Sequence, residues 1–297
     1  MVQGKGIKII SNIVLFIFAL CAVLPIILLL IGSLTDNATA LSEGFSYFPS
    51  KWSTTAYEYI VQAWATVGRG YINTILVTVV GTAVSLLVTS MFGYGITVEG
   101  LPGKKLLIGL LVLTMLFNGG IVAQYMVYNR LLHIRDTIFA LIVPNYLMST
   151  FNVILVSNFF RNNVPAGILE AARIDGASEF RVFWKILLPL SKPILATIGI
   201  MTAIGYWNDW MNGLYYLTSR NGGKFYTIQL ILNEIANQVN FLASRAAEMG
   251  VTVDSSAVPT TTVRMAIALV GILPIIIAFP FFQKYFVKGI AVGGVKG

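Results

Sequence analysis

The sequence predicts an all-α, polytopic membrane protein with six transmembrane helices and a pair of amphipathic helices on the cytoplasmic side. Composition is the first reason: hydrophobic residues make up 57% of the chain and charged residues only 11%, whereas a soluble domain carries about 25% charged residues. The mean hydropathy of +0.80 agrees with this. The second reason is a set of apolar runs, and the third is a long charged stretch between two of them, residues 170–193.

Six apolar runs carry the prediction of spans. A hydrocarbon core of about 30 Å takes about 20 helical residues to cross, and each run is long enough. The third run is the least regular, because Asn118, Gly119 and Gly120 interrupt it. The six runs lie near residues 13–34, 71–97, 106–128, 137–160, 194–217 and 265–287.

The first run also shares features with a signal peptide, since Lys5 and Lys8 precede it and the small residues 38–40 follow it. The apolar segment of a signal peptide is usually about 7–15 residues long, however, and this run is longer. We therefore expect an uncleaved first span.

The distribution of charge predicts the orientation. With the N-terminus inside, the inner segments hold 12 basic and four acidic residues, and the outer segments hold as many acidic as basic residues. An excess of Lys and Arg marks the cytoplasmic side. Both termini and the stretch 170–193 are therefore expected in the cytoplasm, and the net charge of +8 is explained by topology rather than by nucleic-acid binding.

The second run contains a row of small residues at every fourth position: Gly81, Ser85, Thr89 and Gly93. Residues spaced by four lie on one face of a helix, and small ones allow another helix to approach closely. We expect a helix-packing seam there. A path for a substrate is the alternative.

The charged stretch 170–193 predicts two short helices separated by a sharp turn. Gly176 suits the left-handed position that ends a helix. In the second helix Phe180, Phe183, Trp184 and Leu187 follow at i, i+3, i+4 and i+7, so four apolar groups are expected on one face, with Pro189 and Pro193 ending the helix. Such a pair outside the bilayer is typical of a docking element.

The fifth run ends in a polar and aromatic cluster, Trp207, Asn208, Asp209 and Trp210. One interpretation is an aromatic belt at the outer membrane interface, with Asp209 reaching the headgroup water. The other is a sugar site, because amide and carboxylate groups bond hydroxyls while aromatic faces stack on a pyranose ring. The residues alone leave both open.

Two outer loops are long, residues 35–70 and 218–263. The second is unusually long for a connection without apolar runs. Its segment from Ile228 to Val239 has the apolar spacing of an amphipathic helix.

Patterns of catalytic chemistry are missing from the sequence. There is no G-x-x-x-x-G-K-[ST] phosphate loop, no G-x-S-x-G elbow and no Ser/His/Asp set. Cys21 and His133 are the only residues of their kinds, so neither a disulfide within the chain nor a metal-ligand cluster is expected. We expect no enzymatic activity and no cofactor in this chain.

The charged stretch resembles a known loop. Its residues Glu170-Ala171-Ala172, Asp175-Gly176-Ala177, Ile186, Leu188-Pro189 and Pro193 are similar to the EAA loop of permease subunits of bacterial ABC importers. In that family the loop is a coupling helix that sits in a groove of a cytoplasmic ATPase subunit. A loop that merely lies on the membrane surface is the plain alternative. The resemblance implies these ATPase-coupling residues: Glu170, Ala171, Ala172, Asp175, Gly176, Ala177, Phe180 and Phe183.

Two further stretches resemble the carbohydrate branch of these permeases. The C-terminal residues 283–297 are similar to the tail of the maltose-type permease subunit without a large extra domain, and residues 118–125 to permeases for oligosaccharides and uronate-containing sugars of Gram-positive bacteria. The aromatic and amide run of the fifth span also looks like this branch. The resemblance therefore implies a substrate path at Trp207, Asn208, Asp209 and Trp210.

The expected protein is a multi-pass subunit of the bacterial plasma membrane that imports a saccharide by alternating access. The resemblance implies four kinds of partner: a second homologous permease, two cytoplasmic ATPase subunits that hold ATP and Mg, an extracellular solute-binding protein, and the lipid bilayer. The expected regions are 1–70 with the first span, a permease core at 71–290 with the coupling loop 161–193, and a tail at 291–297. Permeases for peptides or amino acids, an ion-coupled secondary transporter and a membrane scaffold are the alternatives.

Overall fold

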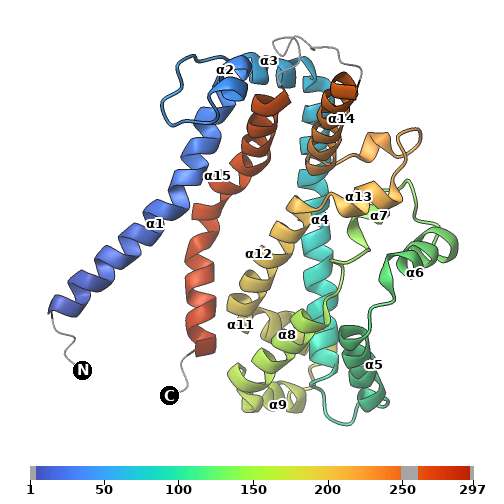
Figure 1. The fold of residues 1–297 in the computed structure, drawn as a ribbon. Coiled ribbons are helices and arrows are strands. Elements are labelled where there is room, and N and C mark those ends of the chain that lie inside the picture. Colours follow the sequence, from blue (N-terminus) through green and yellow to red (C-terminus); the bar gives the residue numbers. More distant parts are fainter. Residues whose placement is uncertain (1–4, 249–259, 295–297) are drawn as a thin grey trace. The chain divides into compact units, whose positions relative to one another are not determined.

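The computed structural model describes residues 5–248 and 260–294 (Figure 1). Within these ranges the chain is helical, and the only β-type pairing is an isolated bridge between Thr35 and Trp52. Contacts between residues divide the chain into two compact units. Unit 1 comprises Met1–Gly68 and Ile231–Pro274, and unit 2 comprises Arg69–Leu230 and Ile275–Gly297.

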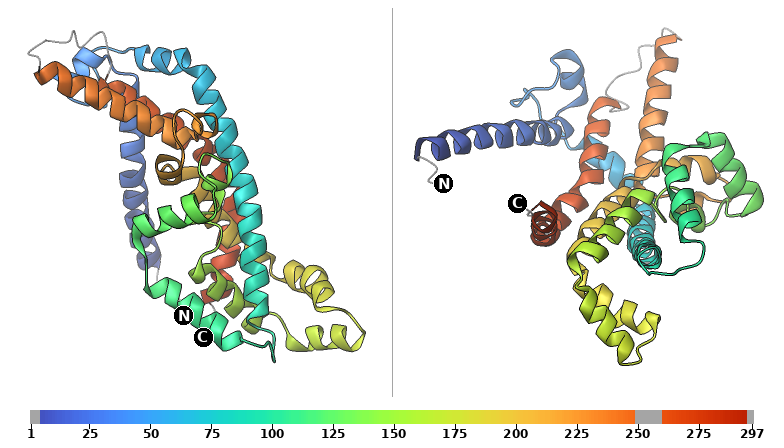
Figure 2. Two further views of the ribbon diagram at one scale, coloured as in Figure 1. Left: turned by 90° about the vertical axis from the view of Figure 1, so that its right-hand side faces the viewer. Right: turned by 90° about the horizontal axis from the view of Figure 1, so that it is seen from below.

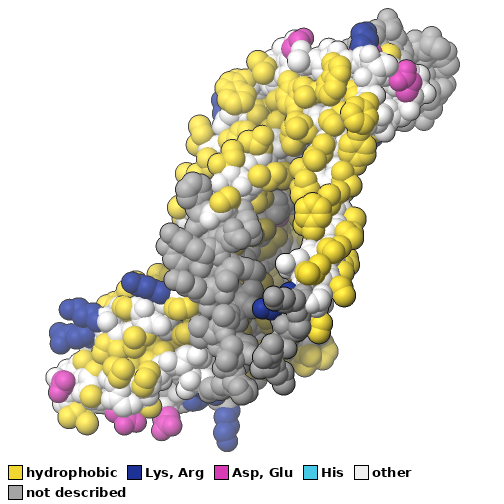
Figure 3. Space-filling view, turned by 90° about the vertical axis from the view of Figure 1, so that its left-hand side faces the viewer, with side chains coloured by type: hydrophobic (Ala, Val, Ile, Leu, Met, Phe, Trp, Pro, Cys, Tyr) yellow, Lys and Arg dark blue, Asp and Glu magenta, His cyan; other side chains and the backbone are white. Residues whose placement is uncertain are grey.

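Unit 1 contains the first predicted span, which is confirmed as helix α1 (Lys5–Ser33). Its apolar side chains are exposed along the helix (Figure 3), as expected for a surface that faces lipid. The end of α1 is tied to the following segment by a bond of 2.6 Å between the hydroxyls of Ser33 and Tyr57. The other elements of unit 1 are α2 (Asn37–Ser42), α3 (Thr55–Gln62), most of α14 (Ile228–Glu248) and the first part of α15 (Thr260–Gly294).

Unit 2 is built along α4 (Trp64–Gly95), the longest helix within it (Figures 1 and 2). The part of α15 from Ile275 onward also belongs to unit 2, and the remaining helices lie between α4 and Leu230. They are α5 (Lys104–Leu116), α6 (Gly120–Met126), η1 (Val127–Leu131), α7 (Phe139–Ile142), α8 (Thr150–Asn163), α9 (Ala166–Ile174), α10 (Glu179–Val182), η2 (Phe183–Leu187), α11 (Leu188–Leu190), α12 (Lys192–Asn208), α13 (Met211–Tyr216) and η3 (Gly223–Phe225).

Among the described residues of unit 2, two of the apolar clusters lie along α4. The first joins the C-terminal end of α4 to α8, η2 and α12, and its buried members include Tyr94, Val156, Phe183 and Ile198. The second joins the middle of α4 to α7, α12 and α13, and it is rich in tyrosine. The segment α9–α11 projects beyond the first cluster, at the end where α4 leads into α5 (Figure 2).

Three of the predicted spans are not single helices. The run 106–128 breaks between Leu116 and Gly120, and Gly120 has a φ of +75°. The run 137–160 forms only the short α7, turns at residues 143–149 and becomes helical again at α8. The run 194–217 is interrupted at Asp209, whose ψ of 118° is extended. The interruption of the third run at Asn118, Gly119 and Gly120 was visible in the sequence, whereas apolar side chains around the other two breaks do not report backbone turns.

The span count of six therefore stays a prediction. Among the described residues, α1 and α4 are long and apolar enough to cross a membrane, and the bent pair Glu179–Leu190 with Lys192–Asn208 passes the same test jointly. The amphipathic helix expected from Ile228 is confirmed as the beginning of α14. In the predicted outer loop 218–263, residues 249–259 lie outside the described residues, as do 295–297 of the tail.

Candidate functional site

The turn between α9 and α10 is a Schellman motif centred on Gly176. The Gly176 N–H donates to the carbonyl of Arg173 at 3.0 Å, and the Ala177 N–H donates to that of Ala172 at 2.9 Å. Gly176 has a φ of +79°, the left-handed conformation predicted from the sequence. Ala172 and Ala177 both pack against the apolar cluster, which supplies the hydrophobic contact typical of this motif.

The second helix differs from the prediction. Phe183 and Leu187 are buried, but Phe180 and Trp184 remain 67% and 44% exposed, so the prediction that these four groups share one face is wrong. The exposed pair Phe180 and Trp184 and the buried pair Phe183 and Leu187 are each spaced by four residues, so they form two adjacent strips of the helix, and only the second strip faces the core. The Phe183 ring lies there 5.7 Å from that of Tyr94.

The end of this helix also differs from the prediction. Pro189 was expected to stop the helix, but α11 runs through it to Leu190. The missing N–H of proline is tolerated in a first helical turn, and Pro189 occupies that position in α11 just after the π-helical segment. The chain instead bends by 81° at Ser191 before α12 begins.

Exposed groups from α9 and α10 form a mixed apolar and charged surface, which we call the loop surface. Ile174 is 85% exposed, and Glu170, Ala171 and Asp175 are also exposed. Figure 3 shows apolar, basic and acidic side chains together on this projecting segment, at its lower left. The loop surface consists of Glu170, Ala171, Ile174, Asp175, Phe180, Arg181 and Trp184.

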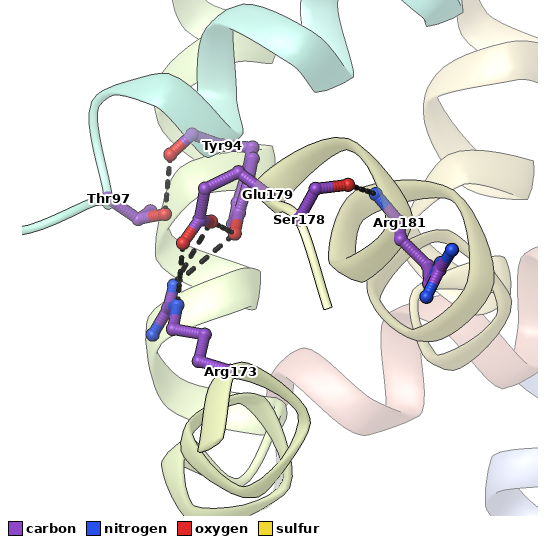
Figure 4. A network of polar contacts seen from close by, with 6 residues as sticks. All are labelled: Tyr94, Thr97, Arg173, Ser178, Glu179 and Arg181. Atoms are coloured by element: carbon purple, nitrogen blue, oxygen red, sulfur yellow. Dashed lines mark hydrogen bonds and ion pairs between the residues drawn. The ribbon is translucent and has the colours of Figure 1, made fainter. Parts of the chain in front are cut away.

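A polar network connects this loop to α4 (Figure 4). The Arg173 guanidinium donates to the Glu179 carboxylate through Nε at 2.7 Å and through Nη2 at 3.3 Å. The Tyr94 hydroxyl donates to the same carboxylate and accepts a bond of 3.3 Å from Arg173 Nη2. The bonds from Arg173 and Tyr94 hold the pKa of the Glu179 carboxyl below its usual range.

The fifth-span cluster is arranged mainly as a helix start. Asp209 is 7% exposed, and its Oδ1 accepts bonds from the backbone N–H groups of Met211 and Asn212 at 3.1 and 3.2 Å. This is the geometry of a side chain that caps α13. Asn208 and Trp210 are exposed and Trp207 is half-buried. The four predicted path residues are thus neighbours in sequence but not a single enclosed pocket.

Asn212 is a site residue that the sequence reasoning did not single out. Its Nδ2 donates to the carbonyl of Pro144 at 3.1 Å, and its Oδ1 accepts from the Asn145 amide at 2.9 Å. Asn145 has a φ of +66°, which asparagine tolerates better than most residues. The Pro-Asn pair at 144–145 was the available signal of a turn inside the fourth run.

The small-residue row of α4 faces other elements of unit 2. A Cβ at Gly81 would lie 2.7 Å from the Tyr206 ring of α12, and one at Gly93 would lie 3.1 Å from Val156 of α8. The Ser85 hydroxyl donates to the carbonyl of Tyr146 at 2.9 Å. Thr89 is buried as well. These contacts favour the packing interpretation of the row.

Within the described ranges, no group of His, Cys, Asp and Glu side chains gathers as metal ligands would. The described site therefore consists of the loop surface at one end of unit 2 and the polar network that joins it to α4. Together with the long apolar helices α1 and α4, these features are those of an integral-membrane protein.

Comparison with known proteins gives the family. The chain belongs to the binding-protein-dependent transport system inner membrane component family, whose model matches residues 89–292. It is thus a multi-pass permease component of a transport system in the plasma membrane and not itself an enzyme. The family inferred from the EAA-type residues is confirmed by this match, and their coupling role stays a prediction.

Individual relatives are similar over nearly the whole chain. A polygalacturonan/rhamnogalacturonan transport system permease protein of Bacillus subtilis is 36% identical, with 95% of this chain and 96% of the relative covered. An arabinooligosaccharides transport system permease protein of the same organism is 28% identical, with 92% and 90% covered. Among solved structures, a bacterial ABC transporter involved in the import of the acidic polysaccharide alginate matches with a TM-score of 0.78 and 28% identity, covering 96% of this chain and 99% of its own.

Proposed function

We propose that this chain is a permease subunit of an ATP-driven importer that moves a saccharide, most simply an oligosaccharide, into the cytoplasm. The observation that carries the proposal is the agreement among its relatives, which are named for polygalacturonan, rhamnogalacturonan and arabinooligosaccharide transport. The alginate importer agrees in fold over almost the full chain. Nothing comparable favours a peptide or amino-acid substrate, or an ion-coupled mechanism.

The proposed partners follow from the family and from the loop surface. An extracellular binding protein delivers the saccharide, and a second permease completes the path. Two ATPase subunits bind ATP and Mg and receive the loop surface, where Ile174 and Phe180 insert as apolar anchors while Glu170 pairs with a basic group. Exposed apolar side chains rimmed by charges are characteristic of such docking sites.

The proposed mechanism is alternating access. Closure of the two ATPases displaces the loop surface, and the helices attached to it rearrange so that the path opens outward and then inward. Trp207, Asn208, Asp209 and Trp210 are proposed to lie beside that path, where aromatic faces and polar groups suit a sugar. Each hydrogen bond to the ligand is expected to contribute about 0.5–1.5 kcal/mol, weak enough for release.

Reconstitution tests the proposal directly. The complete complex is placed in proteoliposomes with its binding protein, and ATP hydrolysis and uptake are measured with a panel of oligosaccharides, monosaccharides, amino acids and peptides. We expect an oligosaccharide to stimulate both activities. Stimulation by peptides or amino acids alone would show that the saccharide assignment is wrong.

The proposed orientation has its own test. Cysteine replaces Ser178 or Ser219, both exposed, in a Cys21→Ala background. An impermeant thiol reagent added outside intact cells should label position 219, and position 178 should react only after the cytoplasmic side is opened. Labelling of both positions from one side contradicts the proposed topology.

A further inference from the structure

We propose that Arg173, Glu179 and Tyr94 form a clamp that makes α9 and the C-terminal end of α4 move as one body. The inference rests on the proposed function, in which an ATPase pushes on the loop surface. The three residues are positioning residues: they hold the loop at a fixed angle so that its displacement reaches the transmembrane helices. None of them needs to touch the transported solute.

The ion pair between Arg173 and Glu179 spans the turn at Gly176. Arg173 lies in the last turn of α9 and Glu179 in the first turn of α10, so their contact closes across the turn. Because the guanidinium reaches both carboxylate oxygens, at 2.7 and 3.3 Å, the pair fixes orientation as well as separation. The ion pair thereby sets the angle between α9 and α10.

Tyr94 connects this ion pair to α4. Tyr94 lies in the last turns of α4, is 8% exposed and contributes its hydroxyl to both charged partners. Its ring also packs against Phe183. Nearby, the Arg161 guanidinium donates to the carbonyl of Ile96 at 3.0 Å, which ties α8 to the same end of α4.

The clamp matters for α9 in particular, because α9 has less buried packing than the helix that follows it. No residue of α9 is buried, whereas Val182, Phe183 and Leu187, just beyond the turn, are anchored in the core. The second helix is therefore positioned by apolar packing. The direction of α9 depends on the Schellman turn, on partial packing of Leu169 and Ala172, and on the clamp.

The clamp fixes the angle between α9 and α10 but adds little to the stability of the folded protein. The side chains of Arg173 and Glu179 are 37% and 51% exposed, and ion pairs in such positions add little to folding free energy. Variants that break the clamp should therefore fold and assemble, but transmit motion poorly. Folding and transport can therefore be measured separately in the same variants.

The test uses the complete complex with four variants: Tyr94→Phe, Arg173→Glu, Glu179→Arg and the double exchange of the two charges. Lys105→Glu is the matched control, because Lys105 is an exposed cation at the same end of unit 2. Two quantities are measured. One is solute imported per ATP hydrolysed, and the other is the distance distribution between spin labels at Glu99→Cys and Ala166→Cys in a Cys21→Ala background.

We expect each single variant to lower import per ATP by about threefold or more and to broaden the label distribution, with the double exchange restoring both. The Lys105→Glu control should change neither. Tyr94→Phe keeps the ring, so it reports on the clamp even where a charge reversal prevents assembly. Wild-type import and a narrow distribution in Tyr94→Phe and in every single variant that assembles would overturn the clamp.

The label measurement needs only ATP and no saccharide. If no saccharide stimulates the complex while the label distribution still broadens in the variants, the substrate assignment fails and the clamp stands. If saccharide import is normal in all variants with unchanged distributions, the clamp fails and the proposed function stands.

Discussion

The Asn212 side chain donates to the backbone carbonyl of Pro144, a residue 68 positions earlier in the chain, at 3.1 Å. Asn212 is 1% exposed, and through Asn145 it also secures the left-handed residue of the same turn. The break in the fourth run and the break after α12 thus stabilise each other. Two interruptions that would each be costly in an apolar medium satisfy their polar groups jointly.

Asn212→Ala should therefore destabilise the protein, because it leaves the carbonyl of the buried Pro144 without this donor and removes the acceptor of the Asn145 amide. We expect a loss of about 1–3 kcal/mol for an unsatisfied buried group, measured by thermal unfolding of the purified chain in detergent. Asn237→Ala is the control, since Asn237 is exposed and its Nδ2 donates to Asn233 of the same helix. Equal unfolding temperatures for both variants would contradict the role of Asn212.

Substitution of Gly176 tests the backbone strain of the turn without steric crowding of a new side chain. A Cβ there would meet no atom within 4 Å, so only the φ of +79° opposes a side chain. Gly176→Val should abolish uptake while the protein still inserts, because a β-branched residue strains this conformation by about 1–2 kcal/mol. Gly176→Asn should keep most uptake. Full activity of the valine variant would show that the turn is not needed for coupling.

At Gly81, steric crowding rather than backbone strain opposes a side chain. A Cβ would lie 2.7–2.9 Å from three ring atoms of Tyr206, whose hydroxyl is held by the Ile142 carbonyl at 2.7 Å. Gly81→Ala should cost about 1–3 kcal/mol through overpacking. Gly95→Ala in the same helix meets nothing within 4 Å and should be neutral or stabilising. Unfolding temperatures in detergent distinguish the two, and a stable Gly81→Ala would refute the close contact.

Asp209 has a structural role that must be separated from the proposed path. Asp209→Asn keeps an oxygen acceptor for the N–H groups of residues 211 and 212, so it should fold normally. Asp209→Ala removes the cap and should lose about 0.5–2 kcal/mol. If the carboxylate also faces the path, the Asn variant will show reduced uptake or an altered saccharide preference at an unchanged amount of complex. Wild-type uptake by that variant would leave Asp209 with the capping role alone.

Acid should weaken the contact between Arg173 and Glu179. The folded-state pKa of Glu179 is below the ordinary value of 4.5, so the contribution to stability is complete above that value and is lost as the pH falls through the lowered pKa. The difference in unfolding temperature between wild type and Glu179→Gln should be constant at pH 6–8 and shrink below about pH 4.5. Glu99→Gln, at an exposed position, is the control. A difference that grows with acidity would contradict the ion pair.

The sequence by itself determined the membrane class, the family and the turn at Gly176. Each depends on local information: the length of apolar runs, the spacing of the EAA-type residues, and the preference of glycine for a positive φ. The first helix and the beginning of α14 were likewise predicted correctly, because uninterrupted apolar or amphipathic periodicity is a property of the segment alone.

Only the tertiary structure decided where the fourth and fifth apolar runs break and which side of the second loop helix is exposed. Phe180 and Phe183 have the same character in the sequence, but packing leaves one exposed and places the other in the core. Asn212, Tyr94 and Glu179 gained their roles from contacts with residues far away along the chain. Such roles depend on which polar groups the fold brings together in an apolar surrounding, and no local pattern records that.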